Sequence, residues 1–256
     1  MRIYILTQED TFYIPRMLDH LLTERSDVIG VGIVPGEMQP GHLKRYWRML
    51  GTRDFAVTGA RLVGSKALAL VGLLAPLPHS YSVGGAARRH AIASERVRDV
   101  NACAFVESLR ARDVDLLVSI ACPQRIRAEL LSVPVRGAIN IHGALLPRYQ
   151  GVLPSFWVLA QGETQTGVTV HWMDEQIDHG AILLQQPVAI AGNDTVHSLV
   201  HRSKVEVGKK LLVDAIGAIE LGDAPRVPMD HRAATHFSYP DAAAVREFRA
   251  RGRRFI

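Results

Sequence analysis

The sequence contains very little cysteine. Cys103 and Cys122 are the only two cysteines among 256 residues, and they form neither a CxxC pair nor any other metal-ligand spacing. A disulfide-stabilised scaffold and a cysteine-based zinc site are therefore not expected, and no metal is predicted. This cysteine usage is typical of a reducing compartment, so we expect a cytoplasmic protein.

Long hydrophobic runs are also missing. The most apolar stretch, residues 67–77, is too short to span a bilayer, is interrupted by Gly72 and is closed by Pro76 and Pro78. The N-terminus, MRIYILTQED, lacks the charged and apolar segments of a signal peptide. We therefore expect residues 67–77 to form a buried helix rather than a membrane contact.

Several signatures of catalysis and cofactor binding are absent. The turn after the first apolar run, residues 7–11, reads TQEDT and has no glycine, so a dinucleotide bound at this turn is not expected. No serine or cysteine lies in a recognisable nucleophile elbow, and there is no HExxH motif. The sequence thus gives no indication of a covalent serine or cysteine mechanism.

The sequence does contain an alternating pattern of apolar segments in a globular composition, with 48% hydrophobic and 21% charged residues. Strand-like runs alternate with helix-spaced segments, which predicts an α/β, Rossmann-like fold with a mostly parallel twisted sheet of about seven strands flanked by helices. The expected strands are residues 2–7, 27–34, 90–97, 115–120, 135–141, 168–172 and 181–190. The expected helices are residues 12–25, 100–112, 154–162, 193–219 and 241–251, with a further helix beginning at Pro123.

Residues 39–83 are the least regular part of the pattern, and we expect two or three helices here, inserted between the second and third strands. Basic residues are mixed with apolar and aromatic ones in the sequence LKRYWRML of residues 43–50. Two interpretations stay open. The insertion packs on the sheet edge with solvated basic side chains, or residues 43–77 form a basic amphipathic surface that contacts a membrane or a lipid-linked substrate. The net charge of +5 and the pI of about 9.5 agree with an anionic partner without requiring one.

A candidate active site lies at the end of the expected strand 135–141. Asn140 and His142 alternate along it, so both side chains point to one face, near the carboxyl end of a parallel sheet where ligands bind. An asparagine amide can donate to a developing oxyanion, and a histidine can also exchange a proton near neutral pH. Asp178 precedes a later strand and can orient the histidine or take a proton.

With no enzyme nucleophile at hand, this set favours direct attack by a substrate nucleophile on a bound carbonyl. The alternative is a turn or a buried polar pair, in which an Asn-x-His sequence is also common. Four further histidines show no comparable pattern and are expected to be structural or exposed: His171, His179, His197 and His201.

Two longer motifs make the comparison specific. Residues 140–151 read NIHGALLPRYQG, and residues 166–171 read TGVTVH, followed by Met173-Asp174-Glu175 and by Asp178-x-Gly180. Over roughly residues 85–220 the chain resembles the formyltransferases that use N10-formyltetrahydrofolate, which carry an N-x-H-x-S-L-L-P-x-Y-R-G-like segment. The resemblance implies that Asn140, His142 and Asp178 are the catalytic trio and that an amine attacks the formyl carbon. It also implies that the folate is held largely through the backbone of two segments: Ile120, Ala121, Cys122 and Pro123, and Met173, Asp174 and Glu175.

The sequence departs from the family pattern in ways that bear on the acceptor. Ala144 replaces the usual serine, and Gln150 replaces the usual arginine, which puts the substrate contacts of this loop in doubt but not the trio. Residues 7–11 do not match the glycine-rich phosphate turn of glycinamide ribonucleotide formyltransferases. The 35 residues after Leu221 are expected to be too few for the C-terminal barrel of methionyl-tRNA formyltransferases.

The sequence therefore predicts a folate-dependent N-formyltransferase for a small amine, most simply a nucleotide-linked amino sugar. The alternatives are a methionyl-tRNA formyltransferase-like enzyme without the barrel, or a non-catalytic module that binds an anionic partner or a membrane. We expect a catalytic domain at residues 1–222, with the insertion at 39–83, and a C-terminal extension at 223–256. Nucleic acid is the less expected partner, and membrane contact through residues 43–77 stays open. The sequence does not determine the oligomeric state, and a dimer is compatible with it.

Overall fold

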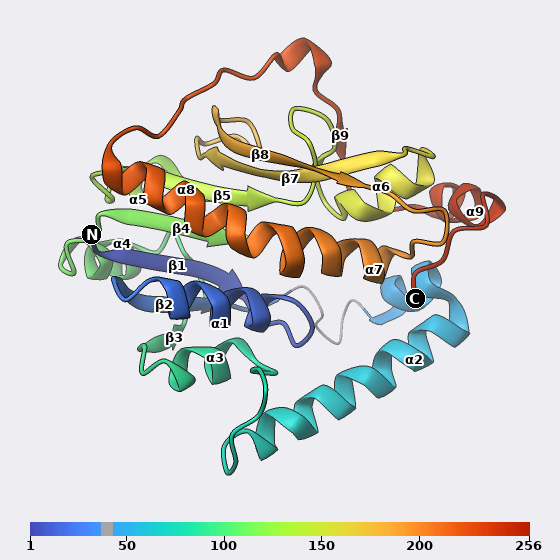
Figure 1. Cartoon of the computed structure of the whole chain (residues 1–256), viewed down its shortest axis with the longest axis horizontal. Helices are drawn as coiled ribbons and strands as arrows, with labels where there is room; N and C mark the ends of the chain where they lie inside the picture. The colour runs from blue at the N-terminus through green and yellow to red at the C-terminus, as the bar shows by residue number, and fades with distance from the viewer. Residues whose placement is uncertain (37–42) are drawn as a thin grey trace.

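The computed structural model describes residues 1–36 and 43–256, and within these ranges seven strands form one sheet in the order β3-β2-β1-β4-β5-β7-β8 (Figure 1). The first five strands in this order, from β3 to β5, all run parallel to one another. Strand β7 is antiparallel to both of its neighbours, β5 and β8. The strands are β1 (Ile3–Gln8), β2 (Val28–Val34), β3 (Ser94–Arg96), β4 (Leu116–Ile120), β5 (Ala138–His142), β7 (Gln165–Trp172) and β8 (Ile182–Ala189), and the short strands β6 (Gln150–Gly151) and β9 (His236–Phe237) pair separately. The predicted Rossmann-like, mostly parallel sheet is confirmed.

Helices cover both faces of the sheet. Helices α1, α3 and α8 lie on one face and α4 and α5 on the other, while α2 projects away from the sheet (Figure 1). The helical segments are α1 (Ile14–Glu24), α2 (Leu43–Val71), α3 (Val83–Arg89), α4 (Cys103–Arg110), α5 (Ala128–Leu131), α6 (Pro154–Ala160), α7 (Val196–His201), the π-helix η2 (Arg202–Gly208), α8 (Lys209–Leu221), the 3₁₀ turn η3 (His231–Ala233) and α9 (Ala242–Ala250).

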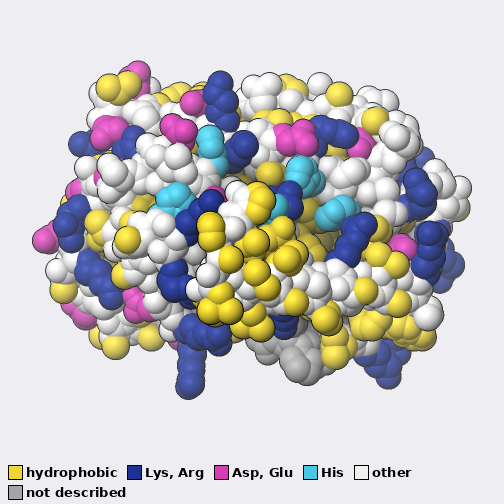
Figure 2. Space-filling view, turned by 60° about the horizontal axis from the view of Figure 1, so that its bottom comes forward, with side chains coloured by type: hydrophobic (Ala, Val, Ile, Leu, Met, Phe, Trp, Pro, Cys, Tyr) yellow, Lys and Arg dark blue, Asp and Glu magenta, His cyan; other side chains and the backbone are white. Residues whose placement is uncertain are grey.

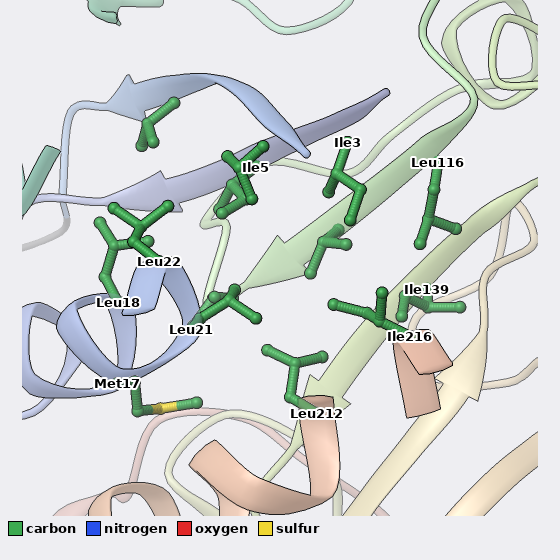
Figure 3. Packing of buried hydrophobic residues seen from close by; sticks show 14 of the residues in the cluster. Ile3, Ile5, Met17, Leu18, Leu21, Leu22, Leu116, Ile139, Leu212 and Ile216 are labelled. Carbon is green, nitrogen blue, oxygen red and sulfur yellow. The ribbon is translucent and has the colours of Figure 1, made fainter. Parts of the chain in front are cut away.

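The alternation of side chains along β1 shows why the apolar run at the N-terminus forms a central strand. Ile3 and Ile5 point to the face covered by α1 and α8 and belong to the same buried cluster as Leu212 and Ile216 (Figure 3). Tyr4 and Leu6 point to the opposite face. Because helices cover both faces, every one of these positions is apolar, and together they hold the strand ends that carry the polar residues described below.

The C-terminal residues pack on the far end of the sheet. After α8 the chain forms an isolated bridge between Val227 and Ile182, then β9 pairs with β6. In α9 and beyond, Phe248 and Phe255 are buried against Phe156 of α6, with ring centroids 4.8 and 5.6 Å from that ring. The segment predicted as a C-terminal extension thus packs closely on residues 1–222, and the division into these two parts stays a prediction.

Two local predictions differ from the structure. No helix begins at Pro123, because residues 123–127 follow an irregular path before α5 and their polar groups are engaged elsewhere. The Gln124 side chain accepts a hydrogen bond from the Val100 amide at 2.9 Å, and the Arg125 carbonyl accepts one from Asn101 at 2.9 Å. The expected strand 90–97 is reduced to β3, since the chain first has to leave α3.

The expectation of a buried helix at residues 67–77 is wrong. Helix α2 bends at Gly51, which has a φ of 77°, and Arg249 of α9 donates to the Leu50 carbonyl at this bend, at 2.8 Å. Met49 is the buried residue of α2, so the helix meets the rest of the chain near its start and then extends outward. Part of the predicted insertion, residues 39–42, lies outside the described residues.

Candidate active site

A cavity of about 1060 Å³ opens at the carboxyl ends of β1, β4 and β5. This is where ligands bind in open parallel sheets, because the loops after neighbouring strands diverge there. Its wall includes Asn140, His142 and Asp178 on one side and the β1–α1 loop on another. The volume is slightly above the range of about 300–1,000 Å³ that is usual for small-molecule sites.

Asn140 and His142 lie on β5 and both turn toward Asp178. The Asn140 amide nitrogen is 3.3 Å from Asp178 Oδ1, and His142 Nδ1 is 3.3 Å from Asp178 Oδ2. The other ring nitrogen of His142, Nε2, lies 2.8 Å from the Tyr149 carbonyl, which can only accept, so Nε2 carries a proton and donates. The structure therefore brings the three predicted residues into direct contact, and their catalytic role stays a prediction.

The loop after β5 holds the Asp178 carboxylate in place. The Gly151 amide donates to Asp178 Oδ2 at 2.8 Å, and the Gln150 side chain donates to the Asp178 carbonyl at 2.9 Å. Gly151 has a φ of 93°, and a Cβ atom there would come within 2.3 Å of the Phe237 carbonyl, so only glycine fits. Gln150, where the family has arginine, thus supports the backbone of the Asp178 loop.

Electrostatics keep Asp178 ionised. Burial by itself raises the pKa of this carboxyl group, but the charge of His142, the hydrogen bond from His171 and the Gly151 amide together lower the pKa well below its usual range. The side chain is only 8% exposed, so little water competes with these contacts. A permanent negative charge is therefore placed beside two donors at the cavity wall.

His171 is part of this cluster and the sequence analysis did not identify it. Its Nε2 atom is 3.1 Å from the Asn140 amide nitrogen and 3.5 Å from Asp178 Oδ1, and its Nδ1 faces the Trp172 carbonyl at 2.8 Å. His171 lies directly opposite Asn140 in the antiparallel β5–β7 pair, which puts both side chains on one face. The TGVTVH motif contained this residue, but the register that pairs it with Asn140 is not visible in the sequence.

The residues expected to bind folate do not all reach the cavity. Ala121, Cys122 and Pro123 line it after β4, and Met173 and Asp174 line it after β7. Ile120 is buried in the sheet, where its carbonyl accepts from Thr7 at 2.7 Å. Glu175 lies in a neighbouring depression, and its carbonyl accepts from Arg125 at 2.5 Å. Burial raises the pKa of the Cys122 thiol to about 11, so this lining group is neutral at physiological pH.

The β1–α1 loop forms another wall of the cavity without a glycine-rich turn. Asp10 Oδ1 accepts from the amides of Phe12, Tyr13 and Ile14 at 2.6 to 3.1 Å. The carboxylate therefore occupies the N-terminus of α1, where a phosphate would otherwise bind. This is the physical reason why the TQEDT sequence differs from a nucleotide-binding turn.

The π-helix η2 places a lysine against the same wall. Lys204 lines the cavity, and burial lowers its pKa while the nearby Asp10 raises it. Two buried hydroxyl oxygens of the wall, Thr11 Oγ1 and Ser203 Oγ, have no hydrogen-bond partner in the described part of the chain. Buried polar atoms are normally paired, so these groups are suited to contact a ligand. A π-helix is rare and often occurs at functional sites, and neither the helix type nor Lys204 was anticipated from the sequence.

Comparison with known proteins identifies the family of this chain. Residues 80–216, more than half of the chain, match the family model described as formyl transferase. The chain belongs to the formyl transferase family. The matched range contains β4, β5 and β7 with the whole Asn140–Asp178 cluster, so the family assignment covers the part of the chain that builds this wall of the cavity.

Among curated relatives of this family member, the methionyl-tRNA formyltransferase of Anaeromyxobacter dehalogenans is 36% identical over 198 residues, covering 73% of this chain and 62% of that protein. The methionyl-tRNA formyltransferase of Methylacidiphilum infernorum is 35% identical over 150 residues, covering 59% of this chain and 47% of that protein. The chain thus spans about half the length of the curated relatives that it matches.

Solved structures share the fold of this family member at low sequence identity. Glycinamide ribonucleotide transformylase 1 from Symbiobacterium toebii superposes with a TM-score of 0.61 and 20% identity, covering 87% of this chain and 89% of that one. The N-formyltransferase from Helicobacter canadensis, solved with folinic acid and dTDP-3-aminofucose, gives a TM-score of 0.59 and 17% identity over 93% of this chain and 71% of that one.

Proposed function

We propose that this protein transfers a formyl group from N10-formyltetrahydrofolate to the amine of a small anionic acceptor. The observation that carries the proposal is the cluster of Asn140, His142 and Asp178 at the wall of one large cavity. Family membership supports formyl-transfer chemistry, and the folinic acid in the Helicobacter canadensis protein supports a folate donor for this fold.

The cavity has features that suit a folate. Cys122, Ile126 and Met173 give one side an apolar lining, which is compatible with a flat pterin ring. Ala121 adopts a φ of 54°, which turns the backbone after β4 sharply at the point where the family binds its pterin. We propose Ala121, Cys122, Pro123, Met173 and Asp174 as the folate-binding set, and leave Ile120 and Glu175 out because they do not line this cavity.

The cosubstrate supplies a formyl carbon bonded to a nitrogen that can leave. When the acceptor amine attacks, a new carbon–nitrogen bond forms, the bond to N10 breaks, and the amine proton is transferred to N10. Asn140 and His142 donate hydrogen bonds to the formyl oxygen as it gains negative charge. Each such bond replaces one of their contacts with Asp178, His171 or Tyr149. Asp178 stays ionised, holds the His142 ring through Nδ1 and thereby assists the movement of the proton.

The charges around the cavity favour an acceptor that carries a phosphate or diphosphate. Lys66, Arg96 and Lys204 all line the cavity. Since Asp10 occupies the N-terminus of α1, these cations are the available partners for an anionic group. We therefore propose a nucleotide-linked amino sugar as the acceptor class, placed between the cluster and η2.

One substitution tests the mechanism. His142→Ala is expected to lower kcat by about 10²- to 10³-fold, because an oxyanion donor and proton carrier is lost, while binding of N10-formyltetrahydrofolate measured by calorimetry is largely kept. His20→Ala, on α1 away from the cavity, is the matched control. Turnover retained in His142→Ala would contradict the mechanism. Folate binding without release of tetrahydrofolate by the natural protein, over a panel of amino sugars, would instead support a non-catalytic binding module.

A second acceptor, initiator methionyl-tRNA, is favoured by one observation. The curated relatives described above are methionyl-tRNA formyltransferases, at 35 and 36% identity. Formylation of charged initiator tRNA at a rate exceeding that with nucleotide-linked amino sugars would establish this acceptor and remove our preferred one.

A further inference from the structure

Helix α2 and the turn after it form an exposed apolar surface. Leu70, Leu73 and Leu74 are 66, 55 and 92% exposed, and further large hydrophobic side chains of the same segment are also exposed: Leu43, Trp47, Val57, Val63, Leu68 and Val71. Figure 1 shows α2 projecting from the body of the protein, with the turn at its end as the outermost point of the lower side. Figure 2, which brings that side forward, shows hydrophobic side chains gathered in the middle of the face with lysine and arginine around them. Monomeric proteins rarely expose an apolar patch of this extent unless it binds something.

The same helix holds the whole excess of positive charge. The chain has 30 lysine and arginine residues against 25 aspartate and glutamate residues. Helix α2 has six of the basic residues and one acidic residue, Asp54, so the other residues carry 24 charges of each sign. A local net charge of this size attracts an anionic surface.

Charge and hydrophobicity are arranged in sequence along the segment. Residues 67–77 contain no charged side chain and lie at the outer end, whereas Lys66 directly precedes them, Arg61 lies six residues before them, and both are exposed. Within the described residues, no helix is long and apolar enough to cross a bilayer. A segment that has an apolar end with basic residues beside it can enter the interface of an anionic membrane without spanning the membrane.

We propose that α2 and residues 72–77 dock this protein on the surface of an anionic phospholipid bilayer. The leucines at the outer end would enter the headgroup region, and the basic residues behind them would contact lipid phosphates. A second copy of this chain is the less suitable occupant, because a symmetric contact through this face would bring two strongly positive helices together.

The docking surface is continuous with the cavity. Leu62 and Lys66 of α2 line the cavity described above. Docking would therefore place one wall of the cavity at the headgroup layer. The proposal itself depends only on the surface of α2, and its test measures lipid binding rather than formyl transfer.

Vesicle co-sedimentation tests the proposal. The purified full chain is expected to bind vesicles containing phosphatidylglycerol at low salt, and to bind pure phosphatidylcholine vesicles at least tenfold more weakly. The double variant Leu73→Glu/Leu74→Glu is expected to lose binding, because it places two anionic groups at the outer end. The double variant Arg53→Gln/Arg61→Gln should bind about 30-fold more weakly, since each of the two basic residues strengthens binding to an anionic membrane about fivefold.

Matched controls separate docking from general effects. Leu221→Glu/Val227→Glu changes two exposed hydrophobic residues elsewhere and is expected to bind as the natural protein does. Circular dichroism of every variant checks that the fold is kept. Absence of binding to phosphatidylglycerol vesicles would overturn the proposal, as would full binding by Leu73→Glu/Leu74→Glu. A dimer in lipid-free solution that this same variant dissociates would assign the surface to a second copy and equally overturn it.

Discussion

Replacing Asp178 by asparagine probes the cluster most directly, because the side chain keeps its shape and loses its charge. In the natural protein the carboxylate accepts from the Gly151 amide at 2.8 Å and lies 3.3 Å from both His142 and Asn140. An asparagine oxygen can still accept from Gly151. It cannot form the ion pair with His142, and its own amide hydrogens would face other donors.

The magnitude follows from the burial of this ion pair. Hydrogen bonds to charged groups contribute about 1.5–3 kcal/mol each, and removing one partner of a buried pair leaves the other uncompensated, so we expect a loss of about 2–3 kcal/mol in the free energy of unfolding at pH 5. For a domain of this size that corresponds to a fall in Tm of roughly 5–10 °C. The rate of formyl transfer should fall by about 10²- to 10³-fold.

The lowered pKa of Asp178 determines how the difference in stability between the two proteins changes with pH. The pKa of Asp178 is lower in the folded than in the unfolded chain, so its contribution is fully present above the unfolded pKa near 4 and is lost as the pH falls toward the folded pKa. Urea unfolding of both proteins from pH 5 to pH 3 should therefore show the difference in stability shrinking with acidity.

Asp174→Asn is the matched control for stability. Asp174 belongs to the same loop and lies 2.7 Å from His179, but its side chain is 41% exposed. We expect its replacement to cost less than about 1 kcal/mol, because solvent screens this pair. The reasoning would be refuted if Asp178→Asn cost no more than this control at pH 5, or if its deficit were as large at pH 3 as at pH 5.

Three further predictions concern other parts of the molecule. A maleimide should label the exposed Cys103 well before Cys122, because the raised pKa of Cys122 keeps it a thiol. A bound folate analogue should slow the labelling of Cys122 further, as measured by peptide mass spectrometry. Equal labelling rates for the two cysteines would contradict the assigned environment. Phe248→Ala should lower the free energy of unfolding by about 3–5 kcal/mol in urea titrations, because the ring is fully buried, and Phe248→Leu should cost clearly less. Lys204→Met should raise the KM for a nucleotide-linked amino sugar about tenfold and leave the KM for the same sugar without phosphate unchanged; an equal effect on both would remove Lys204 from the acceptor site.

Much of the sheet could be predicted because its signals are local. The apolar run at the N-terminus, the alternation along β5 and the start of the helix expected from residue 193 each depend on residues a few positions apart. Thr195 accepts from the Ser198 amide at 3.1 Å, as an N-cap at this position should. The predicted helix at Pro123 did not form where the Asn101 side chain engages the backbone of residues 125 and 127. The predicted strand 90–97 is shortened because its first residues still bond to the end of α3, with the Ile92 amide donating to the Ala87 carbonyl.

The sequence alone therefore determined an α/β fold, the polar pair Asn140 and His142 on one face of a strand end, and the motifs that indicate formyl transfer. Only the tertiary structure decided that His171 lies opposite Asn140, that Lys204 reaches the cavity from a π-helix, and that residues 67–77 are exposed. The physical reason is that a periodic pattern reports which residues prefer to be buried, while strand register, helix type and the direction of a projecting helix depend on contacts between distant segments. The charge and the apolar residues of α2 were visible in the sequence from the start, but that they share one uncovered surface was not.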